Sequence, residues 1–414
     1  MKWHIINVVW GEEYLKTFID LSIPSQLSKG NIPDIPKDVQ AIYRIYIDRT
    51  AKDKFLQSHA FQSLKSHIEV ELCDIQTLAY ITGYKILAAC HSDSIKKAVQ
   101  ESAILIFLAP DCIYSQGVFA SYYKYLKMGK KLIATPCIRL SKEKIIESLT
   151  QSSFLPSPIL SFSSQELTKI ALKNLHPMTL SHFRTNKKIH THCSHIYWWL
   201  DKETILIRPF HIHPFVIDLQ NKIFPKDSID GDFICRAVPD KSLWKLILNS
   251  EESIVFELSN DNKFSPFNLM TPSKSNIYLW TRKYARPAHH YFISHKFYLG
   301  TGKRKPEWRD IEQKSDQLIK WISSSKQIFK IILIPKIWFN FFLKYCFRYL
   351  KAMFLIITGK KKVTIKQVFQ HFFSPGSKKI ETVVLSLNQT KNKDQIQKPF
   401  NESVSRSKKK SFQR

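Results

Sequence analysis

Residues 103–111 read Ala-Ile-Leu-Ile-Phe-Leu-Ala-Pro-Asp, an unbroken apolar run that ends in a proline and a carboxylate. Such a run is typical of a strand that is buried on both faces at the centre of a parallel sheet. Shorter apolar runs predict further strands at 4–9, 43–47, 68–72 and 131–135. The sequence therefore predicts a sheet with the first of these runs at its centre.

Helical patterns separate the predicted strands. The predicted helices cover residues 12–27, 52–65, 73–90, 94–101, 119–128 and 167–175. Strands and helices that alternate at this spacing indicate the α/β class. A stretch rich in Ser and Pro at 148–164 predicts a boundary, which divides the body into residues 1–147 and 148–300.

The composition of the 414 residues excludes several classes of protein. Neither G-x-G-x-x-G nor G-x-x-x-x-G-K-[ST] occurs, so the common phosphate-binding loops are absent, and no G-x-S-x-G marks a hydrolase. The seven cysteines are dispersed without a C-x-x-C, which argues against a disulfide framework and favours a reducing compartment. The first residues lack the layout of a signal peptide. We therefore expect a cytoplasmic protein.

Three features follow predicted strands and form the first candidate site. They are Trp10-Gly11, Asp48 and Asp111. Ligands of open α/β sheets bind beyond the carboxyl ends of the strands, so these residues could hold a base, a ribose and a metal-bound diphosphate. A carboxylate is a hard oxygen ligand that suits Mg²⁺ or Mn²⁺. The alternative is that Asp48 and Asp111 only cap loops or helices.

A second group of residues carries histidines and carboxylates later in the chain. His211 and His213 share one face if their segment is extended, and Asp230 and Asp232 do the same unless Gly231 forms a turn. Carboxylates near a histidine suit metal binding or general-base chemistry. The alternative is a solvated turn beside two hydrogen-bonded histidines.

The C-terminal part of the chain concentrates the positive charge. Of a formal charge of +29, residues 303–414 contribute 26 Lys and Arg against 7 Asp and Glu. Within the apolar stretch 331–358, polar residues recur at steps of four, four, four and three, which places them on one helical face. They are Lys336, Asn340, Lys344, Arg348 and Lys351.

This pattern predicts an amphipathic helix at a membrane surface. A spanning helix is disfavoured because each basic group near its centre costs roughly 2.5–3.5 kcal/mol. In the interface, the basic face meets anionic head groups and the aromatic face enters the acyl boundary. We therefore assign residues 301–365 to a helical membrane-surface segment and residues 366–414 to a basic, largely disordered tail. The alternative is a core helix that packs on the body.

Taken in order, several short motifs resemble a family of bacterial glycosyltransferase-like proteins with the nucleotide-diphospho-sugar transferase (GT-A) fold. The resemblance covers roughly residues 4–260. The motifs are Trp10-Gly11 followed by Tyr14, residues 24–33, Pro110-Asp111 with Ser115 and Gly117, residues 211–214, residues 230–233, and the Phe-Glu-Leu-Ser at 256–259. The resemblance implies a mixed, mainly parallel sheet flanked by helices.

The resemblance also implies three groups of site residues. Trp10, Gly11, Asp48 and Ser115 would contact the nucleotide sugar; Asp111, His211 and His213 would bind Mn²⁺ or Mg²⁺; Asp232, Asp230 and Glu257 would act in catalysis. The motif after the central strand is Asp111-Cys112-Ile113, which departs from the D-x-D of the family.

The expected function is transfer of a sugar from a nucleotide-diphosphate donor to a lipid-linked or polysaccharide acceptor. The membrane-surface segment places the protein at the inner face of the cytoplasmic membrane, with anionic lipid as a partner. The alternative is a non-catalytic scaffold or binding protein that keeps the fold. Nucleic acid is not favoured as a partner, because the basic excess accompanies an aromatic helix and no recognisable nucleic-acid module.

Overall fold

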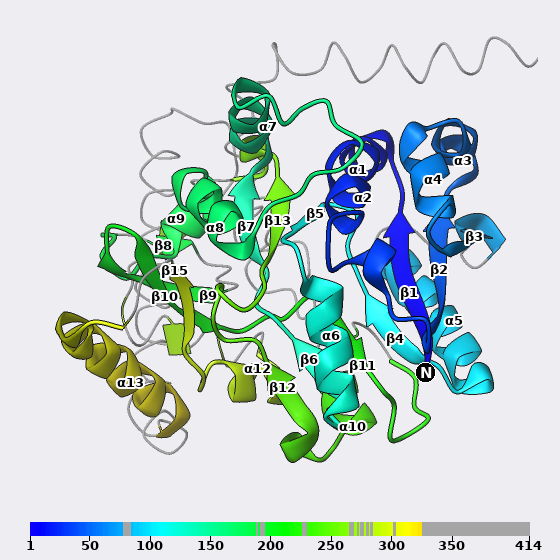
Figure 1. Ribbon diagram of the computed structural model, residues 1–414. Coiled ribbons are helices and arrows are strands. Elements are labelled where there is room, and N and C mark those ends of the chain that lie inside the picture. The colour runs from blue at the N-terminus through cyan, green and yellow to red at the C-terminus, as the bar shows by residue number, and fades with distance from the viewer. Residues whose placement is uncertain are drawn as a thin grey trace, which may run out of the picture. The chain divides into compact units, whose positions relative to one another are not determined.

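Residues 104–107, inside the apolar run that ends at Asp111, form the central strand β4. In the computed structural model, β4 is the middle strand of seven in the main sheet of the described chain (Figure 1). In order across the sheet the strands are β12 (Trp244–Leu246), β6 (Leu132–Ala134), β11 (Phe215–Ile217), β4 (Ile104–Phe107), β1 (Lys2–Val9), β2 (Gln40–Ile47) and β3 (Glu69–Asp74). Strand β11 runs antiparallel to both of its neighbours, and the other described pairings are parallel. The prediction of an α/β fold with a mixed, mainly parallel sheet is confirmed.

The described residues all belong to one compact unit, residues 1–325. They are 1–77, 84–187, 189–190, 195–225, 229, 231–264, 269–270, 273, 277–278, 281, 285–300 and 304–324. Of the predicted segment 301–365, Arg309–Ser324 forms helix α13. The predicted amphipathic stretch 331–358 and the basic tail 366–414 lie outside the described residues.

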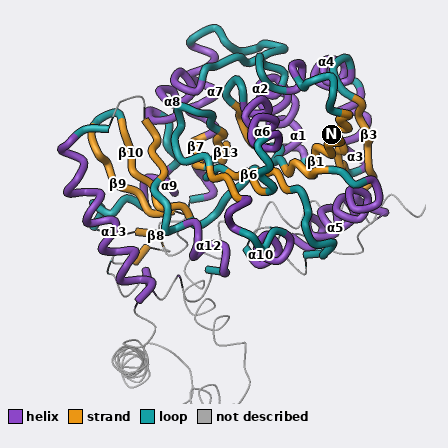
Figure 2. Tube along the Cα trace, turned by 60° about the horizontal axis from the view of Figure 1, so that its bottom comes forward, coloured by secondary structure: helices purple, strands orange, loops and turns teal. Residues whose placement is uncertain are grey.

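Both faces of the main sheet are buried because its strands alternate between two hydrophobic cores. Ile5 of β1 packs into one core, and Ile6 and Val8 pack into the other. The first core is covered by α1 (Glu12–Thr17) with its continuations η1 (Phe18–Ser22) and α2 (Ile23–Gln26), α3 (Arg49–Leu56), α4 (His59–Lys65) and α6 (Val118–Lys127). The second is covered by α5 (Tyr84–Glu101), α10 (Asp232–Ala237) and α12 (Pro287–Phe292). Figure 2 views the sheet nearly edge-on, with α6 on one side and α5 and α10 on the other.

Smaller sheets extend the fold beyond the main sheet. In the described chain they are β5 (Cys112–Tyr114), β13 (Val255–Ser259) and β7 (Ile138–Ser141); β15 (Phe297–Gly300), β10 (Thr204–Pro209) and β9 (His195–Asp201); and the pair β14 (Leu269–Met270) and β8 (Ile189–His190). Helices α7 (Lys142–Gln151) and α8 (Ser164–Lys173) pack with the first two of these sheets in a third core. Helix α9 (Pro177–Ser181) follows α8. Strands from the predicted halves 1–147 and 148–300 pair with each other in the main sheet and in the sheet of β5.

The region predicted as two helices at 73–90 and 94–101 folds differently. Cys73 still belongs to β3, because it pairs with Tyr46 of β2. Helix α5 then begins at Tyr84 and continues without a break through Ser94. The Ser94 hydroxyl donates to the His91 carbonyl 2.8 Å away, so this residue is accommodated inside the helix rather than at its start.

Two of the motifs that carry the resemblance pack against each other. Asn31 is fully buried, donates to the Ser115 carbonyl at 3.0 Å and accepts from the Phe119 amide at 3.2 Å. A Cβ on Gly30, whose φ is 74°, would lie 2.7 Å from the Cα of Gly117. These contacts therefore hold the end of the first helical segment, which consists of α1, η1 and α2, against the loop before α6.

A buried arginine attaches α13 to the body. Arg208 of β10 is fully buried, donates to the Ser315 hydroxyl at 2.7 Å and to the Ser294 carbonyl at 2.7 Å, and forms an ion pair with Asp316. Lys296 adds a second contact to Asp316 at 2.7 Å. Helix α13 is thus held by a charge network as well as by its apolar face.

Replacing Arg208 with alanine is expected to lower the free energy of unfolding by about 2–3 kcal/mol, because the buried guanidinium loses its packing and its hydrogen bonds to Ser315 and Ser294. Urea unfolding measures the difference. The matched control is Lys314→Ala, which breaks the exposed pair with Asp310 in the same helix and should change the free energy by about 0.5 kcal/mol or less. Equal midpoints for the two variants would contradict the anchoring role.

Candidate functional site

The order of the strands creates a switch point between β1 and β4. From β1 the chain proceeds to β2 and β3 on one side and then returns to place β4 on the other side of β1. Because β1 and β4 are parallel, the loops that follow them leave the same edge of the sheet. Crevices at such points are where open α/β sheets bind ligands. Trp10 follows β1 and Asp111 follows β4, so this edge is the candidate site (Figure 1).

The loop after β1 is held in place by Asp48. The Gly11 amide donates to Oδ2 of Asp48 at 3.1 Å, and Oδ1 of Asp48 accepts from the Ala51 amide at 2.9 Å as the N-cap of α3. Burial favours a higher pKa for Asp48, but hydrogen bonds from Thr50, Gly11 and Ala51 lower the pKa below its usual value. The cap interpretation of Asp48 is correct, and the same carboxylate also positions the predicted Trp10-Gly11 loop.

Asp111 lies beside a second carboxylate, Glu257. Glu257 is on β13 and pairs in register with Cys112, the residue after Asp111. The Leu258 amide donates to the Asp111 carbonyl at 2.7 Å, which ties the loop to β13. Burial, together with the nearby charge of Glu257, raises the pKa of Asp111 to about 7. Two predicted residues from different groups, one metal-binding and one catalytic, are therefore brought together.

Basic side chains surround this carboxylate pair. Arg139 of β7 forms an ion pair with Glu257 at 2.6 Å. Lys263 lies 4.9 Å from the ring centroid of Tyr14 and 3.1 Å from the Glu13 carboxylate. The roles of Glu13, Arg139 and Lys263 could not be predicted from the sequence, because no local pattern connects these three positions.

Tyr14 links the Trp10 loop to the carboxylates. Its ring lies 6.1 Å from the ring of Trp10. Burial raises the pKa of Tyr14, and the charges of Asp111 and Glu257 raise it further. The aromatic loop after β1 and the Asp111–Glu257 pair therefore belong to one site, and the charge of Lys263 acts on both Tyr14 and Asp111.

The histidines of the second group lie in the segment between β10 and β11, and His211 has two further histidines near it. The ring of His211 lies 4.6 Å from that of His289, in α12. His195 makes a hydrogen bond to the Cys137 carbonyl at 3.0 Å, and its pKa is lowered to about 3, first by burial and then by neighbours that include His211. His213 is partly buried next to Phe215. Within the described residues, no three His, Cys, Asp or Glu side chains are arranged to hold a metal ion.

The remaining predicted residues lie apart from the carboxylate pair. Asp232 is exposed in the first turn of α10, and Asp230 lies outside the described residues. Gly231 precedes α10 with a φ of 83°, and a Cβ there would lie 2.9 Å from the Cβ of Arg286. Ser115 is fully buried, and its hydroxyl accepts from the Ile254 amide at 3.1 Å, a place that fits packing rather than substrate contact.

The residues around Asp111 could hold a divalent cation together with a bound diphosphate. Mg²⁺ in phosphate-binding sites is usually held by one or two carboxylates together with oxygens of the substrate. Asp111 and Glu257 supply two such carboxylates, and the pKa of Asp111 is raised first by burial and then by the charge of Glu257. Mn²⁺ or Mg²⁺ would therefore need a diphosphate to complete its ligands here.

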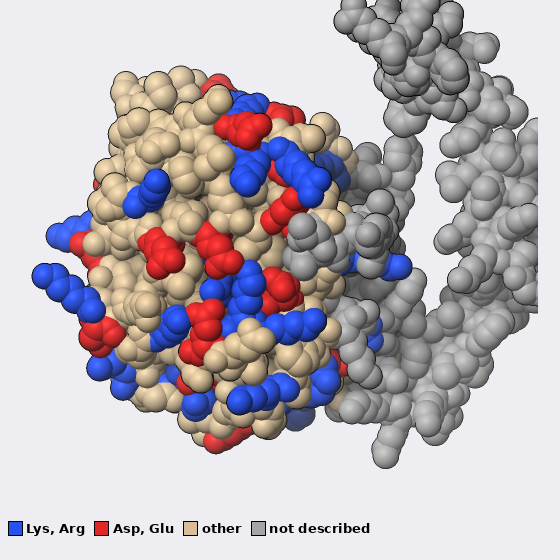
Figure 3. Space-filling view, turned by 90° about the vertical axis from the view of Figure 1, so that its right-hand side faces the viewer, with Lys and Arg blue, Asp and Glu red and all other residues tan. Residues whose placement is uncertain are grey.

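Charge is well mixed on the face that carries β3 and α3 to α5. Figure 3 shows Lys and Arg interspersed with Asp and Glu on this face. Ion pairs there include Arg49 with Asp74 at 2.6 Å and Lys97 with Glu71 at 2.7 Å. This face has no patch of positive charge alone, of the kind that binds phosphate backbones.

Among the described residues, no helix is long and apolar enough to span a bilayer.

Comparisons with known proteins give only distant likenesses. No family model and no curated protein sequence matches the chain. The crystal structure of mouse xyloside xylosyltransferase 1, apo form, matches with a TM-score of 0.24 and 10% identity, over 37% of this chain and 59% of that chain. The crystal structure of S. aureus TarS matches with a TM-score of 0.24 and 11% identity, over 34% of this chain and 22% of that chain. The crystal structure of S. aureus TarS 1–349 matches with a TM-score of 0.24 and 8% identity, over 42% of this chain and 56% of that chain. The chain spans less than two thirds of each of these structures, and at this TM-score the likeness carries no argument about fold or function.

The raised pKa of Asp111 predicts a measurable dependence of stability on pH. Between the ordinary pKa of 3.8 and the folded value of about 7, the folded protein binds more protons than the unfolded chain, so this carboxyl destabilises the fold as pH rises through that window. Asp111→Asn should therefore raise the thermal midpoint at pH 8 by about 2 °C or more and leave it unchanged near pH 4.

The control for this prediction is Asp48→Asn. The pKa of Asp48 is lowered in the folded state, so its charge stabilises the fold above its unfolded pKa, and the variant should lose stability at pH 8. Thermal scans of both variants at pH 4 and pH 8 test the two signs. A lower midpoint for Asp111→Asn at pH 8 would contradict the carboxylate pair.

Proposed function

We propose that this protein is a glycosyltransferase of the GT-A type, which transfers a sugar from a nucleotide-diphosphate donor to a lipid-linked or polysaccharide acceptor. The observation that supports this most directly is the meeting of the Trp10 loop with the Asp111–Glu257 pair at the switch point of the sheet. An aromatic loop, a carboxylate pair and a basic rim are the groups that a base, a metal-bound diphosphate and its remaining charge would use.

In this proposal, the donor lies across the carboxyl ends of β1 and β4. Trp10 and Tyr14 would contact the base, and Asp48 would act indirectly by fixing the Gly11 amide. Lys263 and Arg139 would neutralise the diphosphate. A divalent cation at Asp111 and Glu257, completed by diphosphate oxygens, would supply charge stabilisation to the leaving group.

The reaction requires an acceptor hydroxyl to lose a proton as it attacks the anomeric carbon. The bond from that carbon to the diphosphate oxygen breaks, the nucleoside diphosphate leaves, and the proton passes to a carboxylate base. Asp232, which is exposed in the first turn of α10, is the proposed base, and Asp230 is the alternative.

The second candidate is a non-catalytic protein that binds the nucleotide sugar on the same fold. Two observations favour it: Glu257 already has Arg139 as a partner, and the described residues hold no complete set of metal ligands. Both candidates place the protein in the cytoplasm, at the inner face of the membrane, through the basic segment that follows α13.

Donor binding should be detectable as thermal stabilisation. With Mn²⁺ present, a nucleotide sugar at about 100 times its dissociation constant should stabilise the folded protein by about 2.7 kcal/mol, and Asp111→Ala should abolish the increase in the midpoint. The matched control, Asp310→Ala, removes an exposed carboxylate of α13 and should keep the full increase.

The outcomes of this titration separate the two candidates. Stabilisation together with release of nucleoside diphosphate in the presence of an acceptor supports the transferase. Stabilisation without release under any acceptor supports the binding protein. No stabilisation of the unsubstituted protein by any nucleotide sugar would contradict both.

Membrane association is tested by flotation of the full chain with vesicles. We expect flotation with vesicles that contain anionic lipid and little with neutral vesicles, because each Lys near an anionic surface contributes about 1 kcal/mol. Replacing Lys360, Lys361 and Lys362 with Gln should weaken partitioning on the order of 100-fold. Replacing the exposed Lys314 and Lys320 of α13 with Gln is the control for loss of charge alone. Equal flotation with neutral and anionic vesicles would rule out the interfacial segment.

A further inference from the structure

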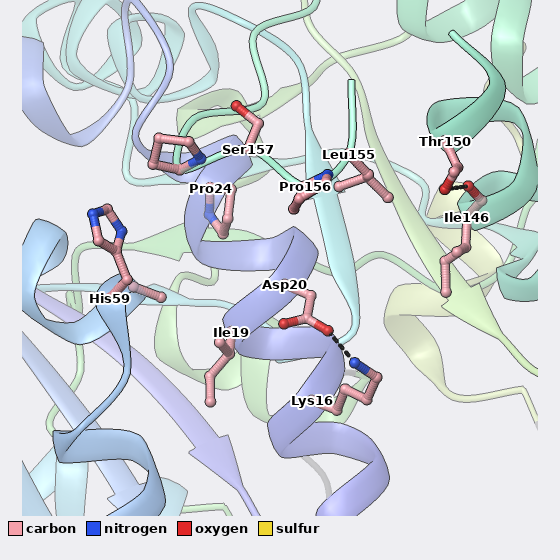
Figure 4. Close-up of a pocket in the computed structure, with 12 residues that line it drawn as sticks. Lys16, Ile19, Asp20, Pro24, His59, Ile146, Thr150, Leu155, Pro156 and Ser157 are labelled. Atoms are coloured by element: carbon pink, nitrogen blue, oxygen red, sulfur yellow. Dashed lines mark hydrogen bonds and ion pairs between the residues drawn. The ribbon is translucent and has the colours of Figure 1, made fainter. Parts of the chain in front are cut away.

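An apolar groove lies between the first helical segment and the loop after α7. It encloses about 670 Å³, within the usual range of roughly 300–1,000 Å³ for ligand pockets. Its apolar lining comes from three parts of the chain, namely Ile19 and Pro24, Ile146, and Leu155, Pro156 and Pro158. Figure 4 shows the first helical segment crossing the opening, with the loop that carries Pro156 above Pro24 and with Ile146 on the neighbouring helix.

Most of the polar groups that line the groove have partners within the protein, and the exposed His59, whose Nδ1 lies 3.2 Å from the Ser63 hydroxyl, adds one further polar side chain at its edge. Lys16 donates to Asp20 at 2.6 Å, one turn away on the same helix. The Thr150 hydroxyl donates to the Ile146 carbonyl at 2.8 Å, and the Ser157 hydroxyl donates to the Ile159 carbonyl at 2.7 Å. A sugar or a peptide would find few polar groups here to replace its bonds to water, whereas a hydrocarbon requires none.

The groove begins about one helical turn from the ion pairs that border the candidate site. The Glu13–Lys142 ion pair, at 3.4 Å, lies at the start of α1 and α7, beside Lys263. Lys16 and Ile146, which line the groove, follow these two residues by one helical turn, or about 5 Å. A molecule with a polar head at the carboxylate pair could therefore extend its tail into the groove without leaving these two helices.

Exposed apolar side chains gather at the same place. Seven large apolar residues are exposed in the described chain, and three of them are Ile146, Phe154 and Ile159. The first lines the groove, and the other two flank its loop. The loop is fixed rather than loosely placed, because the Leu160 amide donates to the Pro24 carbonyl at 2.9 Å and Phe154 packs on the buried Phe162. An apolar rim of this kind marks a surface that contacts lipid or another apolar partner.

We propose that this groove binds the hydrocarbon chain of a lipid-linked acceptor, with the head group of that lipid at the carboxylate site. The proposal rests on the sugar-transfer function proposed above and selects the lipid acceptor over the polysaccharide. The paired polar lining, the position one turn from the site and the apolar rim support the same occupant.

The test is direct binding of alkyl phosphates to the full-length protein by calorimetry, below their critical micelle concentrations. Inorganic phosphate and alkyl phosphates of six, eight and ten carbons are the probes. Affinity should rise about fourfold for each added methylene, since burial of one methylene contributes about 0.8 kcal/mol. Ile146→Asp places a charge on the wall of the groove and should remove the dependence on chain length.

Phe224→Asp is the matched control, because Phe224 is exposed to a similar extent and does not line the groove. It should keep the dependence on chain length, whereas binding of the alkyl chains by the predicted amphipathic tail would leave the dependence intact in Ile146→Asp as well. The proposal is overturned if affinity is independent of chain length, if Ile146→Asp and Phe224→Asp behave alike, or if Ile146→Asp converts a dimer to a monomer, which would assign the groove to a second copy. No donor or turnover enters these measurements, so a failed donor titration and a failed alkyl series are distinguishable.

Discussion

Asp111 can lie beside Glu257 only because the chain around both residues is fixed on several sides. Strand β4 is buried at the centre of the sheet, and the amide of Leu258 holds the carbonyl of Asp111. Arg139 compensates one of the two carboxylates, and the ammonium of Lys263 contacts the ring of Tyr14. An unfixed loop would separate two like charges, so the raised pKa of Asp111 records how firmly the fold imposes this arrangement.

Much of the fold could be predicted because its signals are local. The central apolar run and the helical patterns beside it are properties of neighbouring residues. The second sheet was not predicted, since β5 and β7 contain three and four residues and form only by pairing with β13. Glu257 was named through a resemblance, but its partner Arg139 lies more than a hundred positions away and no sequence pattern connects them. Ser115 shows the converse case, because a hydroxyl after a strand looks available for binding until its burial is known.

The helical segment formed by α1, η1 and α2 presents two different surfaces on successive turns. Near its start, Glu13 and Tyr14 belong to the charged site, where each group depends on a partner from another part of the chain. One turn later the exposed charges of Lys16 and Asp20 neutralise each other, and the remaining surface is apolar. A ligand with an anionic head and a hydrocarbon tail matches this order of surfaces. Its head would keep polar partners at the charged site, and its tail would lose contact with water only where the surface is apolar.

The basic segment after α13 has a role in this scheme that does not require it to touch the substrate. Arg208 and Lys296 fix α13, the last described helix, through Asp316. If the segment that follows binds an anionic membrane, encounters between the groove and a lipid occur at the effective concentration of the membrane surface rather than that of the bulk solution. A groove with a modest affinity would then be sufficient, because the proposed membrane contact would supply the proximity that the groove alone does not.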